Sequence, residues 1–368
     1  MASAWPVANA NPLSTHGPGR LARDLLEDAR ERIGAALGVP GTQVTLTSGA
    51  TESANIAVIG AAVAMRSRHG EPALVLCPTT EHAAVLEAAR HVGHSGLGEV
   101  AELEVGGDGL VNLDQLAALS TDRVVVLSAM VVNNETGVRH DLAAIESTVR
   151  DEARDAVLHT DAVQGFAYDD ALLTSASGYD LVTIAGHKLG GPRGIGALGV
   201  RRPERIEQIT FGGSSETALR PGTPDLPGAV GLAVAVELAA AEREAEAARL
   251  GALRERLSGR ILAGSPGVEL TAPSAPHAPH LLHLVAPGVR SEELLVLLDA
   301  EGISASAGAA CTSGASRGSA VLVAMGADAA RARSALRLSL GWSTTAEEVE
   351  EAAATICRAL GQLSSSPR

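Results

Sequence analysis

The chain contains few aromatic residues, few cysteines and fewer basic than acidic side chains. Trp, Tyr and Phe make up only 2% of its 368 residues, so the core has to be built from Ala, Val, Leu and Ile. Three scattered cysteines, Cys77, Cys311 and Cys357, form neither a disulfide framework nor a zinc ligand pattern. Lys and Arg number 29 against 43 Asp and Glu, a net charge of −14, which argues against nucleic acid as the natural partner. We expect an acidic protein with reduced thiols.

Long apolar runs are also missing. The longest, residues 54–65, is shorter than the roughly 20 residues that cross a bilayer, so no membrane partner is expected. Residues 1–10 lack the basic start and apolar core of a secretory signal. A hydrophobic content of 46% with 20% charged residues is typical of a folded soluble protein. These features predict a cytoplasmic enzyme, and the length suggests two domains.

Short apolar segments alternate with helical patterns along the chain. The expected strands of the first part are residues 44–47, 74–77, 124–130, 156–159 and 181–184. Each ends in a polar or small-residue tip, which predicts an α/β fold with a mostly parallel sheet between helices and the tips along one edge. We predict a large domain at 1–226, with an N-terminal arm at 1–19, and a smaller α/β domain at 227–368.

Three of these tips together suit one cofactor. The run LVTIAGHKLGGPRGIG at 181–196 places Lys188 after a strand and continues into glycines that let the backbone approach a bulky ligand. Asp161 follows the preceding strand, and residues 48–52 open a helix whose N–H groups can cradle a phosphate. Taken singly, these are a surface lysine, a turn-capping carboxylate and an ordinary helix cap. Together they favour pyridoxal 5'-phosphate as the cofactor, because it needs an amine for its aldehyde, a carboxylate for its ring nitrogen and a cradle for its phosphate.

Three further side chains have both a functional and a structural interpretation. His82, at another strand tip, could stack on a cofactor ring or move protons, although a lone histidine is more often structural. Arg337 suits a substrate carboxylate, and a structural ion pair is the alternative. Cys311 lies among Ala, Gly and Ser, where a nucleophile that must travel would be placed, whereas Cys77 and Cys357 fit the apolar core.

The motifs, in their order, resemble the pyridoxal-phosphate-dependent cysteine desulfurases (NifS/IscS-like) of the class V aminotransferase superfamily, which have fold type I. The resemblance runs from Asn11 to about Thr345 and includes ANPLSTHGPGR, TSGATES, TEHAAVLE, VNNETG, HTDAVQ, AGHKLGGPRGIGAL, LRPGT, SAGAACTSG and LRLSLGWST. The long interval from Cys311 to Gly326 resembles the branch with an extended cysteine loop, which hands sulfur to scaffold proteins.

The resemblance implies the cofactor contacts. Lys188 would bind the cofactor aldehyde and later take the Cα proton of the substrate, while Asp161 would keep the pyridine nitrogen protonated. His82 would stack on the ring, and Gln164 would bond its phenolic oxygen side. Thr223 would reach the phosphate from a second subunit, which implies a homodimer. The full implied set is Ala50, Thr51, His82, Asp161, Gln164, His187, Lys188 and Thr223.

The resemblance also implies a site for L-cysteine. Arg337 would hold the substrate carboxylate, with Asn134 and Asn11 as further substrate contacts. The Cys311 thiolate would attack the substrate sulfur, leaving L-alanine and an enzyme persulfide for a sulfur-acceptor protein or scaffold. Iron–sulfur cluster assembly, tRNA thiolation and specialised sulfur metabolism are the implied destinations.

Three departures from the family pattern predict weakened cofactor binding. A segment of the type YLDNAATT normally precedes the Asn-Pro opening, and this chain starts just ahead of that opening. Ala185 replaces a usual phosphate-binding serine, a loss of about 0.5–1.5 kcal/mol for one hydrogen bond. His280 stands where the family tends to have asparagine.

Two other functions remain open. A selenocysteine lyase or another C–S lyase would bind the same amino-acid groups of its substrate, although a simple β-elimination needs no thiol such as Cys311. A non-catalytic sulfur-relay or scaffold partner would explain the departures, whereas the intact Lys188, Asp161 and Arg337 favour an active enzyme.

Overall fold

The structure, a computed structural model, describes residues 1–7, 9–169, 178–213, 218–308 and 318–365. The chain forms two compact units. The large unit comprises Met1–Leu103, Leu113–Val131 and Asp141–Arg243, and the small unit comprises Glu104–Asn112, Val132–His140 and Glu244–Arg368. Helix α6 (Leu226–Gly264) contains the predicted boundary at 226/227, and the units change over within this helix. The two-domain division at that residue stays a prediction.

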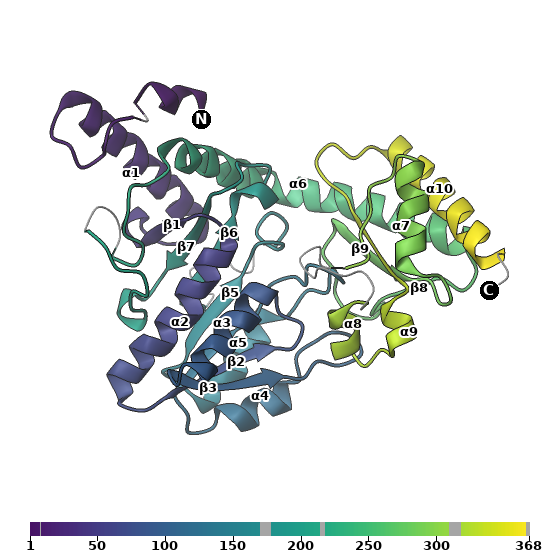
Figure 1. The fold of residues 1–368 in the computed structure, drawn as a ribbon, viewed down its shortest axis with the longest axis horizontal. Helices are drawn as coiled ribbons and strands as arrows, with labels where there is room; N and C mark the ends of the chain where they lie inside the picture. Colours follow the sequence, from purple (N-terminus) through teal and green to yellow (C-terminus); the bar gives the residue numbers. More distant parts are fainter. Residues whose placement is uncertain (8, 170–177, 214–217, 309–317, 366–368) are drawn as a thin grey trace. The chain divides into compact units, whose positions relative to one another are not determined.

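A seven-stranded sheet forms the centre of the large unit (Figure 1). Its order is β1-β7-β6-β5-β4-β2-β3. The strands are β1 (Val44–Thr47), β2 (Ala73–Pro78), β3 (Gly98–Leu103), β4 (Val125–Ser128), β5 (Val157–Asp161), β6 (Leu181–Ala185) and β7 (Gly196–Val200). Only β7 runs antiparallel to its neighbours, β1 and β6. The predicted α/β fold with a mostly parallel sheet is therefore confirmed.

The helices of the large unit follow the alternation that the sequence predicts. They are α1 (Gly17–Leu37), α2 (Ala50–His69), α3 (Ala83–His94), α4 (Leu113–Ser120), α5 (Leu142–Glu152) and the first part of α6. Helix α2 packs against both the sheet and α3, and its alanines are buried on several sides, as in a helix that is apolar all round. The surrounding core consists mainly of Ala, Val, Leu and Ile side chains, with Met65 and Cys77, as the scarcity of aromatic residues requires.

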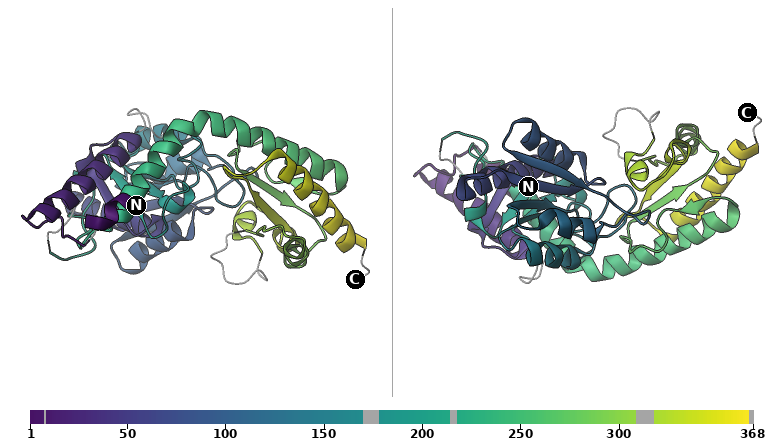
Figure 2. Two further views of the ribbon diagram at one scale, coloured as in Figure 1. Left: turned by 90° about the horizontal axis from the view of Figure 1, so that it is seen from above. Right: turned by 90° about the horizontal axis from the view of Figure 1, so that it is seen from below.

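The small unit contains a three-stranded antiparallel sheet of order β10-β9-β8. Its elements are β8 (Glu269–Leu270), β9 (Leu281–Val285), β10 (Ala335–Ser339), α7 (Ser291–Ala300), α8 (Ala320–Ala324), α9 (Ala329–Ala332) and α10 (Ala346–Ser365). Helix α10 runs beside the second half of α6 (Figure 2), where a Cβ on Gly264 would lie 2.7 Å from Cys357 Sγ. Cys77, in contrast, is fully buried in β2, and burial raises the pKa of its thiol. Neither cysteine is placed as a solvent-exposed nucleophile.

The sequence predicted the strongly apolar elements and missed the weaker ones. Strand β1 has the predicted bounds, but β3, β7 and β8 and helices α4, α5 and α9 were not predicted. Strand β7, GALGV, contains two glycines, which are poor strand formers, so its pairing between β1 and β6 depends on its neighbours. None of the helices in the described ranges combines the length and apolar character needed to cross a bilayer.

Candidate active site

Asp161 is the last residue of β5, a central strand of the large sheet. Its side chain is only 7% exposed, and Oδ1 accepts a hydrogen bond from the Val163 N–H at 2.9 Å. Burial raises the pKa of Asp161, although the Val163 hydrogen bond and the charge of His82 act in the opposite direction. A buried carboxylate of this kind gains from a cationic partner, which a protonated ring nitrogen would provide.

Glu81, which the sequence did not single out, lies close to Asp161. It is 4% exposed and accepts hydrogen bonds from the backbone N–H groups of His82, at 3.2 Å, and of Met130. Burial and the Asp161 charge raise the pKa of Glu81 to about 8. The pair therefore carries less than two negative charges at neutral pH when no cation lies beside it. The sequence signal that could have identified Glu81 was its position directly before His82, in the segment that follows a predicted strand.

The raised pKa of Glu81 predicts how stability depends on pH. Its folded-state pKa of about 8 lies above an unfolded value of about 4.3, so the contribution to stability is complete below the unfolded pKa and is lost as pH rises through 8. We expect the free energy of unfolding of the cofactor-free protein to fall between about pH 5 and pH 8, by up to about 1.4 kcal/mol per unit from this group. Glu81→Gln should flatten that slope in chemical denaturation, while Glu87→Gln on the exposed face of α3 should not. Parallel slopes for Glu81→Gln and wild type would contradict the assignment.

His82 has a structural role beside its predicted one. It is the N-cap of α3, and its Nδ1 accepts a hydrogen bond from the Ala84 N–H at 3.1 Å. In the neutral ring the proton therefore lies on Nε2. The half-buried imidazole is held at one end by this cap and acts electrostatically on Asp161. Stacking on a cofactor ring stays a prediction that this fixed orientation permits.

A buried polar chain crosses the sheet next to Asp161. His159 Nδ1 lies 2.8 Å from Ser128 Oγ in β4, and Nε2 lies 2.9 Å from Thr183 Oγ1 in β6. Burial lowers the pKa of His159 to about 3, so the ring is neutral. Because side chains two residues apart share a face of a strand, His159 lies on the same face as Asp161. This series of hydrogen bonds holds β5, the strand that carries Asp161, to its two neighbours. The sequence alone did not reveal these hydrogen bonds.

Lys188 follows β6, the strand beside β5, in a short 3-10 turn, Gly186–Lys188. It is exposed, and it is the single lysine among the 368 residues. No other side-chain amine of this chain could bind an aldehyde. His187 is also exposed, and burial and then the positive charges of Lys188 and Arg193 lower its pKa. The turn needs glycine at position 186, because a Cβ there would meet Pro192 O at 2.7 Å.

The N-terminus of α2 has the geometry expected of an anion cradle. Its N-cap is Gly49, which makes no side-chain capping hydrogen bond, so the ordinary Ser or Thr cap is absent. Thr51 is exposed and Ala50 half-buried in the first turn, where helical N–H groups lack intrahelical partners. A Cβ on Gly196, at the start of β7, would meet Gly49 Cα at 2.8 Å, so glycine lets these backbones touch.

A carboxylate also lies at this helix end, folded away from the first turn. Glu52 accepts a hydrogen bond from the Ser48 N–H at 2.5 Å and forms an ion pair with Arg220 at 3.1 Å. Burial alone would raise the pKa of Glu52, but these contacts lower it. The Ser48 N–H and Arg220 hold the Glu52 carboxylate, so the helix N-terminus remains available to bind an anion.

Three of the remaining large-unit residues, Gln164, Thr223 and Asn11, lie in loops. Gln164 is half-buried in the turn after β5, and Thr223 is exposed in the segment before α6. Ala185 is fully buried at the end of β6, so a serine hydroxyl is indeed missing at this position. Asn11 is exposed, and its Oδ1 accepts a hydrogen bond from the Leu13 N–H at 2.9 Å, which gives it a turn-forming role beside the predicted substrate contact.

The small unit brings Arg337 and Asn134 together. Arg337 lies in β10, is half-buried, and donates from Nη1 to the Asn134 carbonyl at 2.8 Å. Burial lowers the pKa of Arg337, and the negative charge of Glu135 partly offsets this. His280, the third departure from the family pattern, is buried just before β9. Cys311 lies outside the described residues.

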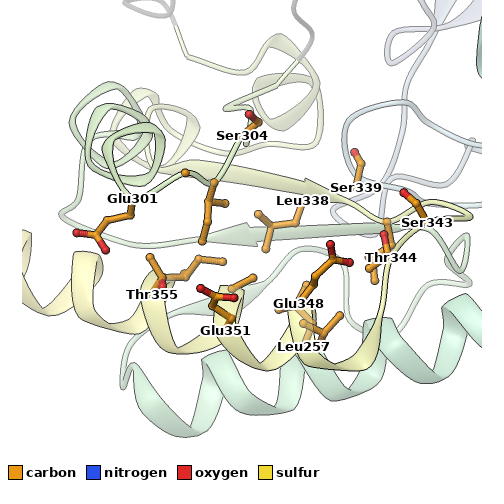
Figure 3. Close-up of a pocket in the computed structure, with 16 residues that line it drawn as sticks. Leu257, Glu301, Ser304, Leu338, Ser339, Ser343, Thr344, Glu348, Glu351 and Thr355 are labelled. Carbon is orange, nitrogen blue, oxygen red and sulfur yellow. The ribbon is translucent and has the colours of Figure 1, made fainter.

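The small unit also has a cavity of about 470 Å³ (Figure 3). Its lining side chains come from the 301–304 segment, β10, the following turn and α10, with Leu257 of α6 beneath them. None of the predicted site residues that the structure describes lines it. The candidate site is therefore defined by side chains at strand ends rather than by this cavity.

Comparison with known proteins identifies the family of the chain. The Aminotransferase class-V family matches residues 5–351. The chain belongs to this family. It is 38% identical to an IscS-like cysteine desulfurase of Mycobacterium tuberculosis over 93% of the chain and 87% of that protein. The structure of a NifS-like protein superposes with a TM-score of 0.88 at 30% identity, covering 98% of this chain and 94% of the other. DndA from Streptomyces lividans superposes with a TM-score of 0.76 at 34% identity, covering 92% and 94%.

Class V aminotransferases depend on pyridoxal phosphate, and the residues of the large unit fit that group. They supply a single amine, a buried carboxylate at the end of the neighbouring strand, and a helix N-terminus without a side-chain cap. When bound, the cofactor supplies the electron sink for chemistry at the substrate Cα. Lys188 would hold its aldehyde, Asp161 its ring nitrogen, and the first turn of α2 its phosphate.

Proposed function

We propose that the chain is a cysteine desulfurase, which takes sulfur from L-cysteine and leaves L-alanine. The observation that carries this is the placement of Asp161 at the end of β5 and of Lys188 in the turn that follows the adjacent parallel strand β6. The Mycobacterium tuberculosis relative, 38% identical over most of the chain, is named a cysteine desulfurase, which supports the same substrate here.

The protein residues divide the chemistry. Lys188 is the base for the Cα proton, because an amine at this place can both bind an aldehyde and accept a proton. Arg337 binds the carboxylate of cysteine through its guanidinium. The Cys311 thiolate attacks the substrate sulfur, forming an S–S bond as the substrate Cβ–S bond breaks. The electron pair of the broken bond stays on the substrate Cβ, which then takes up a proton. The products are alanine and a persulfide on Cys311.

Assembly, location and acceptor belong to the proposal as well. We infer a cytoplasmic homodimer to which Thr223 of each copy contributes, and the exposure of Thr223 is compatible with such a contact. The persulfide sulfur would pass to an acceptor protein, for iron–sulfur clusters, tRNA thiolation or a specialised product. Sedimentation of the wild-type protein tests the dimer directly.

The experiment that tests the function measures alanine and sulfide from L-cysteine in the presence of a thiol. Wild type should release the two products in equal amounts, and Cys311→Ala at equal cofactor loading should release neither at more than about 1% of that rate, the scale expected for loss of a nucleophile. Cys357→Ala is the matched control and should keep its activity. Bound cofactor without alanine from the wild type would contradict the desulfurase and favour a non-catalytic relay, whereas activity with selenocysteine alone would favour a lyase.

A further inference from the structure

A buried carboxylate, Glu135, joins three separate segments of the small unit. The side chain of Glu135 is 4% exposed, and its backbone N–H donates to Asn133 Oδ1 at 3.0 Å. Its Oε2 accepts a hydrogen bond from Ser319 Oγ at 2.6 Å, a residue that is 184 positions later in the chain. A Cβ on Gly308 would lie 2.9 Å from the same oxygen, so Gly308 packs directly against it. Neither the reaction nor the cofactor contacts described above use this carboxylate.

The contacts of Glu135 lie at the two ends of the segment that carries Cys311. Gly308 is the last described residue before residues 309–317, and Gly318 and Ser319 are the first after them. Ser319 is the N-cap of α8, where its Oγ accepts from the Leu322 N–H at 3.1 Å, and its own N–H donates to Ala332 O at 2.9 Å. One carboxylate oxygen therefore touches both ends of the segment at once.

The same cluster includes the strand that carries Arg337. Ser306 and Arg337 form an isolated antiparallel bridge, with Arg337 N–H to Ser306 O at 2.6 Å and Ser306 N–H to Arg337 O at 3.2 Å. Ser306 Oγ then donates to Gly308 O at 2.8 Å. The guanidinium of Arg337 in turn bonds the carbonyl of Asn134, the neighbour of Glu135. The ends of the cysteine segment and the predicted carboxylate-binding arginine are thus built on one frame.

We propose that Glu135 is a positioning residue, which holds Gly308 and Ser319, the described residues on either side of 309–317, on the same frame as Arg337 and so governs persulfide formation on Cys311. The inference rests on the proposed desulfurase function, since it concerns the persulfide-forming thiol. The effect acts through hydrogen bonding and packing, because the Ser319 hydroxyl and Gly308 meet the same carboxylate oxygen of Glu135. A Gln at 135 keeps the acceptor for Ser319 Oγ, whereas an Ala removes it.

The test uses four variants of the full chain: Glu135→Ala, Glu135→Gln, Ser319→Ala and Gly308→Ala. Misplacement of a reacting group by about 1 Å costs on the order of 10²-fold, so Glu135→Ala and Gly308→Ala should slow persulfide formation on Cys311 by about 10- to 100-fold. Ser319→Ala should slow it by several-fold, and Glu135→Gln should stay within about threefold of wild type. The KM for cysteine should change less than kcat in each. Glu347→Gln, an exposed acid on α10, is the control.

A second readout is independent of catalysis. A nitroxide attached to Cys311 in a Cys357→Ala background should move faster in Glu135→Ala and Gly308→Ala than in wild type or Glu135→Gln, because its ends lose their common anchor. Cys77 is fully buried and escapes labelling. Unchanged nitroxide spectra and persulfide rates in Glu135→Ala and Gly308→Ala would overturn the proposal. If Glu135→Ala does not fold, Ser319→Ala and Gly308→Ala decide the question by the same readouts. A wild type that makes no alanine would refute the desulfurase, while the nitroxide spectra would still test the anchoring.

Discussion

Lys188→Ala should lower turnover of L-cysteine by about 10³- to 10⁴-fold or more, because one side chain supplies both the attachment for the cofactor aldehyde and the base at the substrate Cα. Since this is the only lysine of the chain, no neighbouring amine can replace it. Borohydride treatment of the cofactor-loaded wild type should fix the cofactor covalently at Lys188 and at no other side chain. The measurements are steady-state turnover, the visible absorbance of the bound cofactor, and peptide mass spectrometry.

Lys188→Arg is the control that separates charge from chemistry. It keeps a positive charge in the turn after β6 but offers no amine for an aldehyde. We expect it to be as inactive as Lys188→Ala and to lack the same absorbance. Turnover above a few per cent of wild type in either variant would mean that Lys188 is only a surface charge, the ordinary role of lysine.

Asp161→Asn should lower kcat by about 10²- to 10⁴-fold, the equivalent of the roughly 3–5 kcal/mol lost when one partner of a buried ion pair is removed. The substitution preserves size, and the Asn oxygen can still accept from the Val163 N–H, so folding should be retained. What is lost is the negative charge that holds a proton on the ring nitrogen. Burial already raises the pKa of Asp161, and a cationic partner would keep it ionised.

The measurement is kcat across pH, together with the absorbance of the bound cofactor. Asp141→Asn is the matched control, because Asp141 caps α5 at the surface and Asn is an equally good cap. That variant should retain wild-type turnover. If Asp161→Asn also turned over cysteine within about threefold of wild type, the carboxylate would be a turn cap and not a cofactor ligand.

Much of the fold was readable because its strands are short apolar runs with polar tips. Residues 44–47 were predicted to the residue, and Asp161 and Lys188 were placed after strands from their local sequence alone. Strand β7 was missed because GALGV has little β propensity of its own and pairs only once β1 and β6 are in place.

The partners of these residues could not be read in the same way. Glu81 contacts the Met130 N–H 49 positions away, and Ser128 contacts His159 31 positions away. Both pairs depend on the order in which parallel strands are laid side by side, which composition and periodicity do not specify. The same holds for Glu135 and Ser319.

The sequence by itself determined the chemistry: one lysine in the whole chain, an aspartate after a strand, a small-residue turn before a helix, and a cysteine among Ala, Gly and Ser. These are properties of single side chains and their immediate neighbours, so they survive without a fold. Tertiary structure decided the environment: the burial that raises the pKa of Asp161 and Glu81, the neutral His159 between two hydroxyls, and the Glu135 anchor. Burial and hydrogen bonding are relations between distant segments, and only the folded chain brings those segments together.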